Sequence, residues 1–220
     1  MFIGHWAPAF AAAAMSKRAP KLGTLFIAGQ LVDWGFFLFA IVGIEKVRVD
    51  PEATVMVPLD LYHMPYTHSL LGSAVWSLAF VAVLLMARRD LVTALIGGAV
   101  VLSHWFVDLL VHAPDLTLAG GETRYGFGWW NYPAVAITLE LTLIIGAFVW
   151  YIKRTNGPVM PPYILLGLLL VMQAINWFGP PPTEAGLPLY LTALASFGVA
   201  AWVAYWVGTT RRHMQDRGLA

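Results

Sequence analysis

Six apolar stretches, each about as long as a membrane-spanning helix, constrain this 220-residue chain more than any other feature. A helix needs ~20 consecutive apolar residues to cross the hydrocarbon core of a bilayer. Hydrophobic residues make up 59% of the chain and charged residues only 11%, which is too little polar surface for a water-soluble domain. We therefore expect an all-α fold, a polytopic membrane helix bundle with six transmembrane helices in a single domain over residues 1–220: Leu22–Glu45, Tyr66–Arg88, Asp90–Ala113, Pro133–Arg154, Pro161–Phe178 and Leu187–Thr209.

An alanine-rich stretch, Phe2–Met15, precedes these six and is too short to span. Its apolar run comes before Lys17 and Arg18, which is the reverse of the order in a cleavable signal peptide. We expect this stretch to be retained as a short N-terminal helix that is either re-entrant or interfacial.

The basic residues predict an orientation. Ten of the thirteen Lys and Arg fall on one side of the expected spans, and the positive-inside rule then places both termini in the cytoplasm. The other side carries longer, acidic loops. The ten are Lys17, Arg18, Lys21, Arg88, Arg89, Lys153, Arg154, Arg211, Arg212 and Arg217.

Charge and cysteine content exclude several classes of function. A net charge of +1 without a basic stripe argues against nucleic acid as a partner. The absence of cysteine excludes disulfides, thiolate metal ligands and cysteine nucleophiles, so any metal must be held by histidine, carboxylate or carbonyl groups. The partners we expect are membrane lipids, together with either a membrane-protein partner or a second copy of the chain.

Ionisable residues within the apolar stretches are candidates for function, because they are costly in lipid and face the protein interior. In the third stretch His104, Asp108 and His112 are spaced i, i+4 and i+8, which places all three on one helix face. A His-x3-Asp pair can hold a metal from two successive turns, as the histidines of H-E-x-x-H do.

Other polar residues are expected at a similar depth. Counted from the basic boundary at ~1.5 Å per residue, they lie between about 18 and 30 Å into the bundle. We therefore predict a site for a divalent metal, zinc or a similar ion, with one or two ions held by His5, Asp33, His68, His104, Asp108 and His112. Glu140 and Asn176 reach the same layer, although an isolated intramembrane Asn such as Asn176 is also typical of interhelical hydrogen bonding.

The order of these residues resembles a known family. A near-N-terminal Gly4-His5, then Asp33, then Thr67-His68-Ser69, then Ser103-His104 with Asp108, is similar to the bacterial membrane-bound metal-dependent hydrolases. That family is distantly similar to the zinc-dependent phospholipase C and single-strand nuclease superfamily. The resemblance covers the first half of the chain. Where many relatives carry Asp-His-Arg before Thr-His-Ser, this chain has Tyr62-His63-Met64, which leaves His63 as a secondary candidate.

The resemblance implies a metal-dependent hydrolase of the bacterial inner membrane, acting on a lipid-borne ester or phosphoester. A carboxylate that is not fully used in metal ligation, Asp33 or Glu140, would be the catalytic base. Ser69, Ser103 and Asn176 would orient the imidazoles from behind.

Two other classes remain open at this stage. Paired histidines such as His68 and His104 can bind haem, although a haem pocket has no need of buried aspartates. A non-catalytic membrane protein, either an accessory subunit of a larger complex or a transporter, is also compatible with six short-looped spans. The segment Gly120–Tyr132, rich in glycine and aromatic residues, is either an interfacial aromatic belt or a lid over an outward-facing site.

Overall fold

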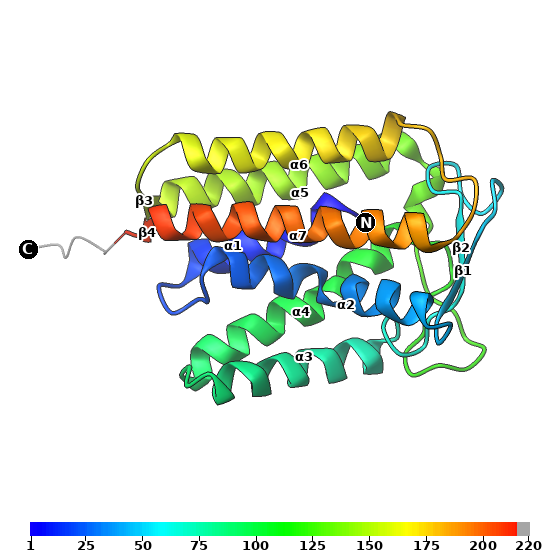
Figure 1. The fold of residues 1–220 in the computed structure, drawn as a ribbon, viewed down its shortest axis with the longest axis horizontal. Coiled ribbons are helices and arrows are strands. Elements are labelled where there is room, and N and C mark those ends of the chain that lie inside the picture. The colour runs from blue at the N-terminus through cyan, green and yellow to red at the C-terminus, as the bar shows by residue number, and fades with distance from the viewer. Residues whose placement is uncertain (215–220) are drawn as a thin grey trace, which may run out of the picture.

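The computed structural model describes residues 1–214, and this part of the chain is mostly helical (Figure 1). Two 3-10 helices, η1 (Ile3–Trp6) and η2 (Trp129–Asn131), accompany the α-helices. Among the α-helices of the described residues, five (α2 and α4 to α7) are long and apolar enough to cross a membrane. The α-helices are α1 (Ala7–Met15), α2 (Leu22–Ile41), α3 (Leu70–Met86), α4 (Leu91–Val111), α5 (Pro133–Arg154), α6 (Met160–Phe178) and α7 (Leu187–Thr210).

The stretch expected to span from Tyr66 to Arg88 forms a shorter helix. α3 has 17 residues, or about 26 Å at the helical rise, against a hydrocarbon core of about 30 Å. It begins late because Tyr66 and Thr67 donate their backbone N–H groups to the Glu45 carboxylate, at 2.8 and 2.9 Å, and Ser69 then caps the helix by accepting from Gly72 N. The expectation of six full-length spans is therefore not met by this segment.

Short strands also occur, so the expectation of a purely helical chain is wrong in this detail. β1 (Lys46–Val49) pairs antiparallel with β2 (Leu59–His63), and β3 (Thr155–Asn156) pairs with β4 (Arg212–His213). β1 and β2 lie in the long connection between α2 and α3, at the end of the bundle opposite to β3 and β4 (Figure 1).

The N-terminal segment is inside the bundle. η1 and α1 pack against α2 and α5, and Ile3, Trp6 and Phe10 have no exposed surface. Trp6 stacks on Phe26 of α2 with ring centroids 5.3 Å apart, and Phe10 meets Phe148 of α5 edge-to-face at 5.7 Å. An apolar segment that is too short to span a membrane is in this way buried among the longer helices.

Gly29 of α2 allows this close packing. A Cβ atom at position 29 would lie only 2.6 Å from the backbone oxygen of His5, so no residue with a side chain fits without displacing η1. The glycine thus brings the backbone of η1 directly against α2, and with it the side chain of His5.

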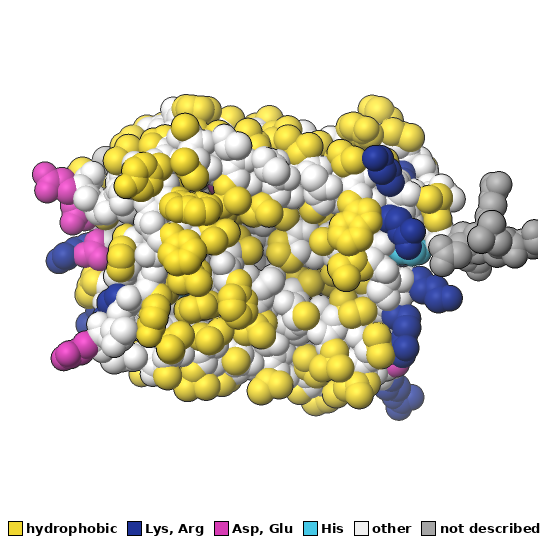
Figure 2. Space-filling view, turned by 180° about the vertical axis from the view of Figure 1, so that it is seen from behind, with side chains coloured by type: hydrophobic (Ala, Val, Ile, Leu, Met, Phe, Trp, Pro, Cys, Tyr) yellow, Lys and Arg dark blue, Asp and Glu magenta, His cyan; other side chains and the backbone are white. Residues whose placement is uncertain are grey.

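Charge is distributed unevenly along the long axis. Figure 2 shows most of the visible Lys and Arg side chains at the end of the bundle where α7 ends, and the visible Asp and Glu side chains mainly at the other end. We call the first the basic end and the second the acidic end. The α3–α4 turn, β3 and β4 lie at the basic end, and β1 and β2 lie at the acidic end (Figure 1).

Candidate metal centre

α4 supplies three of the polar groups at the centre of the bundle. His104 and Asp108 are on consecutive turns, and His112 is the C-cap residue of the helix. All three are buried, with 2% or less of their surface exposed. Both imidazoles reach Asp108, with His104 Nε2 at 3.1 Å from Oδ2 and His112 Nε2 at 3.4 Å from Oδ1. The i, i+4, i+8 spacing therefore places an imidazole on each side of Asp108, and both contact its carboxylate.

Two residues from other segments complete one side of this cluster. Asp33 comes from α2, and His68 comes from the loop that precedes α3. Asp33 Oδ1 lies 3.2 Å from His68 Nε2 and 3.5 Å from His104 Nε2, while His68 Nε2 lies 3.7 Å from Asp108 Oδ2. Ligands about 2.0–2.1 Å from a tetrahedral zinc ion are roughly 3.3 Å from one another. The four distances between imidazole nitrogens and carboxylate oxygens in this set, 3.1 to 3.7 Å, are close to that value.

His5 of η1 lies on the other side of Asp108. Its Nε2 is 2.8 Å from Asp108 Oδ1, and the amino group of Met1 is 2.7 Å from the same oxygen. Asp108 thus presents Oδ2 to His68 and His104, and Oδ1 to His5 and His112. Three overlapping groups have ligand atoms within 4.8 Å of one another: His5 with His104 and Asp108, Asp33 with His68 and His104, and His68 with Asp108 and His112.

The second ring nitrogen of each imidazole is held by the protein. His104 Nδ1 donates to the carbonyl oxygen of Gly29 at 3.0 Å, and His112 Nδ1 donates to Asp115 at 2.9 Å. His5 Nδ1 lies 3.0 Å from the side-chain oxygen of Gln30. Because a proton on Nδ1 leaves a lone pair on Nε2, these contacts direct the ligating nitrogens towards Asp33 and Asp108.

His68 is oriented through a two-residue relay that the sequence did not single out. The Thr67 hydroxyl donates to Glu45 Oε2 at 2.6 Å, so its oxygen is free to accept from His68 Nδ1 at 2.8 Å. Glu45 is buried, with 1% of its surface exposed, and also accepts from Tyr66 N and Thr67 N. A buried carboxylate behind a metal-ligating histidine is a common means of fixing its tautomer.

Glu140, one of the two predicted catalytic bases, has its oxygens occupied. Oε1 accepts from the backbone N–H groups of Phe2 and Gly4, at 2.8 and 2.9 Å, and Oε2 accepts from Gln173 Nε2 at 3.2 Å. Glu140 therefore holds η1 in place, and its contacts are those of an anchor. Asp33, the other predicted base, is more accessible, since 17% of its side chain is exposed.

The secondary candidates lie elsewhere. Ser69 and Ser103 donate their hydroxyls to the backbone oxygens of Pro65 and Val100, at 2.6 and 2.7 Å, and neither contacts an imidazole. His63 is exposed at the end of β2. Asn176 lines the cavity beside the cluster, and its side chain makes no hydrogen bond within the described residues.

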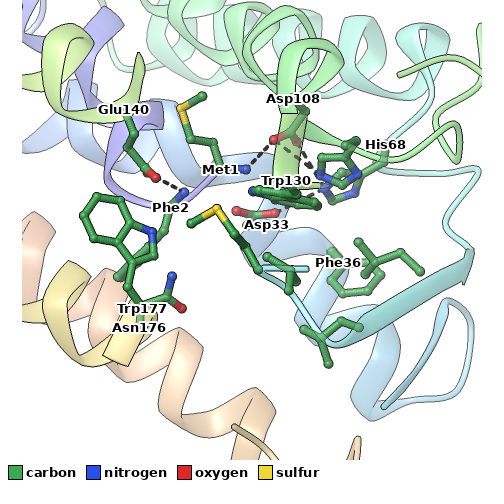
Figure 3. Close-up of a pocket in the computed structure, with 15 residues that line it drawn as sticks. Met1, Phe2, Asp33, Phe36, His68, Asp108, Trp130, Glu140, Asn176 and Trp177 are labelled. Carbon is green, nitrogen blue, oxygen red and sulfur yellow. Dashed lines mark hydrogen bonds and ion pairs between the residues drawn. The ribbon is translucent and has the colours of Figure 1, made fainter. Parts of the chain in front are cut away.

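A cavity of about 130 Å³ adjoins the cluster (Figure 3). In this view Met1, Asp108 and His68 are at one end and Glu140, Phe2, Asn176 and Trp177 at the other. Its remaining wall is largely apolar and comes from α2, from the acidic-end loops and from β2: Phe36, Met56, Val57, Leu59, Leu61 and Trp130. A cavity of this size leaves no room for a porphyrin, which disfavours the haem hypothesis.

Trp130 covers the cluster from the segment Gly120–Tyr132. Its ring centroid is 4.3 Å from that of His112, and its carbonyl oxygen accepts from Met56 N at 3.2 Å. Phe127 and Tyr132 of the same segment are exposed. Tyr125 and Trp129 are partly buried, so the aromatic residues of this segment are divided between the protein interior and the surface.

Two buried atoms of the cluster have no hydrogen-bond partner among the described residues, namely His104 Nε2 and Asp108 Oδ2. Both are acceptors, because the His104 proton is on Nδ1, yet they face each other at 3.1 Å. Two buried acceptors are held together only when a cation or an additional proton lies between them. The donor set of imidazole and carboxylate groups suits a divalent metal.

Comparison of the chain with protein-family models, with curated proteins and with solved structures found no match. The chemistry of this cluster and of the cavity beside it is therefore the basis for a function.

Proposed function

We propose that this chain is an integral-membrane metal-dependent hydrolase that acts on a lipid-borne ester or phosphoester. The observation that carries the proposal is the convergence of four imidazoles and two carboxylates from four separate segments on one buried point. The residues on which the resemblance to the bacterial membrane-bound metal-dependent hydrolases depends, His5, Asp33, His68, His104 and Asp108, all belong to this cluster. These residues are spread over a hundred positions of the sequence, and their side chains lie together in the folded chain.

The cluster suits one or two divalent cations, with zinc as the first candidate. Asp33, His68, His104 and Asp108 would hold the first, and His5 and His112 would hold a second that shares Asp108. A bound divalent cation supplies a Lewis acid that activates water and polarises the scissile group. Shared use of Asp108 is supported by its two oxygens, which face different imidazole pairs.

The chain itself would supply a base and an environment for the substrate. Asp33 Oδ1 faces His68 and His104, whereas Oδ2 has its nearest imidazole nitrogen, His5 Nδ1, at 3.8 Å. Asp33 Oδ2 can therefore accept a proton from an attacking water. Trp130 and the apolar wall would exclude bulk water and accommodate the hydrocarbon part of a lipid.

The proposed setting is a bacterial inner membrane, with α3 as a sixth, tilted or locally thinned span and η1–α1 as a re-entrant segment. The basic end, which carries the C-terminal ends of α1, α5 and α7, would be cytoplasmic. The N-terminus departs from the expectation of two cytoplasmic termini, because the Met1 amino group is buried within the bundle, 2.7 Å from Asp108 Oδ1. The cavity, which is lined by acidic-end loops, would then receive its substrate from the outer leaflet.

Metal content of the purified full-length protein tests the proposal without knowledge of a substrate. We expect at least one equivalent of a transition metal by inductively coupled plasma mass spectrometry, and its loss in His104→Ala and in Asp108→Ala. His63→Ala is the matched control and should retain the metal, because His63 is exposed and outside the cluster. Protein that contains no metal and is unaffected by these changes would refute the proposal. Metal-loaded protein that cleaves neither ester nor phosphoester lipids would leave a structural metal site and refute the hydrolase.

A further inference from the structure

A second cavity, of about 400 Å³, lies at the basic end, far along the bundle from the cluster. We call it the basic-end pocket. It lies where the end of α1, the start of α2 and the ends of α5 and α7 meet, and its lining includes Ser16, Lys17, Lys21, Tyr151, Arg211 and Arg212. Helix ends at a common level mark the height at which a bilayer passes from hydrocarbon to headgroups.

The lining of the basic-end pocket carries positive charge and no carboxylate. Lys17, Lys21, Arg211 and Arg212 are its cationic residues, with His213 beside them, and none of its described lining residues is Asp or Glu. Lys17, Lys21 and Arg212 are exposed at its rim, whereas Arg211 is only 8% exposed. The pocket therefore has a positive potential that nothing in its described wall offsets.

The guanidinium of Arg211 adds a buried positive charge to the wall of the pocket. Its N–H groups donate to the Thr155 hydroxyl at 2.9 Å and to the carbonyl oxygens of Thr155, Gly157, Pro158 and Ile152 at 2.6 to 3.5 Å, so its contribution to anion binding is its charge. All of these acceptors are neutral, and no ion pair involves Arg211 within residues 1–214. Buried charges in proteins are normally compensated by an opposite charge, so an anion in the pocket would complete the arrangement.

The first turn of α2 adds donors to the same wall. Lys21 caps α2 without a side-chain hydrogen bond, and Leu22 lines the pocket. Gly208 of α7 approaches the start of α2 closely, since a Cβ atom there would lie 3.1 Å from Leu22 N. The unsatisfied N–H groups and the dipole at a helix N-terminus favour an anion.

An apolar groove of about 400 Å³ begins where the basic-end pocket ends. It runs between α1 and α4, is lined by Pro8, Ala11, Ala12, Ile96, Ala99 and Val100, and shares Ser16 with the pocket. From Ser16 back to Pro8, α1 extends about 12 Å at the helical rise. A polar, cationic pocket joined to an apolar groove matches a lipid, with a headgroup and a chain, better than it matches a free phosphate.

We propose that the basic-end pocket binds the phosphate-bearing headgroup of an anionic phospholipid, one acyl chain of which lies in the groove between α1 and α4. Basic pockets at the cytoplasmic ends of membrane helices are suited to such headgroups. Since α1 continues into η1, a lipid in this position also supports the segment that carries His5.

The test is binding of phosphatidylglycerol to the full-length protein in detergent, measured by native mass spectrometry. We expect one lipid to bind more tightly than phosphatidylcholine with the same acyl chains. A variant with Lys17→Gln, Lys21→Gln and Arg212→Gln should weaken binding roughly tenfold or more, because each cation near an anionic headgroup contributes to affinity. The matched control, Arg88→Gln with Arg89→Gln, removes charge from the α3–α4 turn of the same end and should leave binding within about twofold.

Two further arms separate a lipid from a soluble phosphate compound. Ala11→Phe should fill the groove and weaken binding of phosphatidylglycerol without loss of the folded, metal-loaded protein. Glycerol phosphate should displace the lipid only at far higher concentration. Equal binding of phosphatidylcholine, or equal loss in the Arg88/Arg89 variant, would overturn the site. Efficient displacement by glycerol phosphate with no effect of Ala11→Phe would overturn the lipid in favour of a soluble anion.

Discussion

The orientation of His68 depends on Thr67, which links the imidazole to the buried carboxylate of Glu45. A hydroxyl is needed at this position because it must donate to the carboxylate and accept from the ring at the same time. Valine has nearly the same shape and can do neither. The contribution of this relay to metal binding can therefore be measured by replacing a single hydroxyl with a methyl group.

We predict that Thr67→Val lowers metal affinity by about 10- to 100-fold, as loss of a hydrogen bond behind a metal-bound histidine commonly does. Thr67→Ser, which retains the hydroxyl, should stay close to the original protein. Competition with a chelator of known affinity gives the measurement. Thr192→Val serves as control, because the Thr192 hydroxyl donates only to Pro188 O of its own helix. An unchanged affinity in Thr67→Val would mean that packing alone orients His68.

Candidate metal ligands are easier to recognise in the sequence than the residues that orient them by hydrogen bonds. His104, Asp108 and Asp33 stand out because an ionisable group inside an apolar stretch is costly in lipid and is therefore a candidate for function. Glu45 falls at the end of the first expected span, where carboxylates are usually solvated, so its position in the sequence does not indicate a buried role. Its burial follows from the turn that brings Thr67 back against it, which no local pattern shows.

At the scale of elements, the N-terminal segment is held at two points, by Gly29 of α2 and by Glu140 of α5. It has too few residues to span and enters the bundle as a half-length helix. His5 therefore reaches the cluster only as long as both contacts hold η1 in place.

We predict that Gly29→Ala displaces η1 and removes His5 from the cluster. The new methyl group would lie 2.6 Å from the His5 backbone oxygen, and overpacking of this kind costs about 1–3 kcal/mol. The measurement is the melting temperature together with metal stoichiometry, both of which should fall. Gly146→Ala is the matched control, since no atom lies within 4 Å of a Cβ there. Replacement of a helical glycine by alanine without steric conflict should stabilise or be neutral. Equal behaviour of the two variants would contradict the role of Gly29.

Glu140 should act as an anchor and not as a base. Glu140→Ala leaves the N–H groups of Phe2 and Gly4 buried without an acceptor, at a cost of about 1–3 kcal/mol each. Glu140→Gln keeps one acceptor oxygen, so we predict a clear loss of melting temperature in the alanine variant and a much smaller one in the glutamine variant. A glutamine variant that is stable and metal-loaded but has lost all hydrolytic activity would restore the catalytic interpretation.

Element boundaries were predictable where composition changes sharply and not where tertiary contacts decide them. Pro133 and Arg154 bound α5 in the structure as expected, because a proline and a basic pair bracket an apolar run. The start of α3 is delayed by contacts to Glu45, which is distant in sequence. The pairing of β1 with β2 escaped prediction because their alternation is only four and five residues long.

For the whole molecule, the cluster links metal content to stability. Four imidazoles and two carboxylates turn acceptor atoms towards one another, so the bundle without a cation must either bind protons or separate these groups. We predict that a strong chelator lowers the melting temperature and that zinc restores it, because a ligand that binds only the folded state stabilises it in proportion to the logarithm of its concentration. In Asp108→Ala the chelator should have no effect. A melting temperature that is insensitive to chelation in metal-loaded protein would show that the cluster is held by protons.

The orientation of the bundle decides which leaflet supplies the cavity. The chain contains no cysteine, so single cysteines can be introduced without a background to remove. We predict that a membrane-impermeant maleimide labels Glu122→Cys, in the acidic-end loop between α4 and α5, in intact spheroplasts. Asn156→Cys, in β3 at the basic end, should react only after the membrane is permeabilised.

The reverse labelling would turn the acidic-end loops that line the cavity, Met56, Val57 and Trp130 among them, towards the cytoplasm. The substrate would then have to come from the inner leaflet, while the basic-end pocket would face a lipid surface outside the cell, where its positive charge has less anionic lipid to attract.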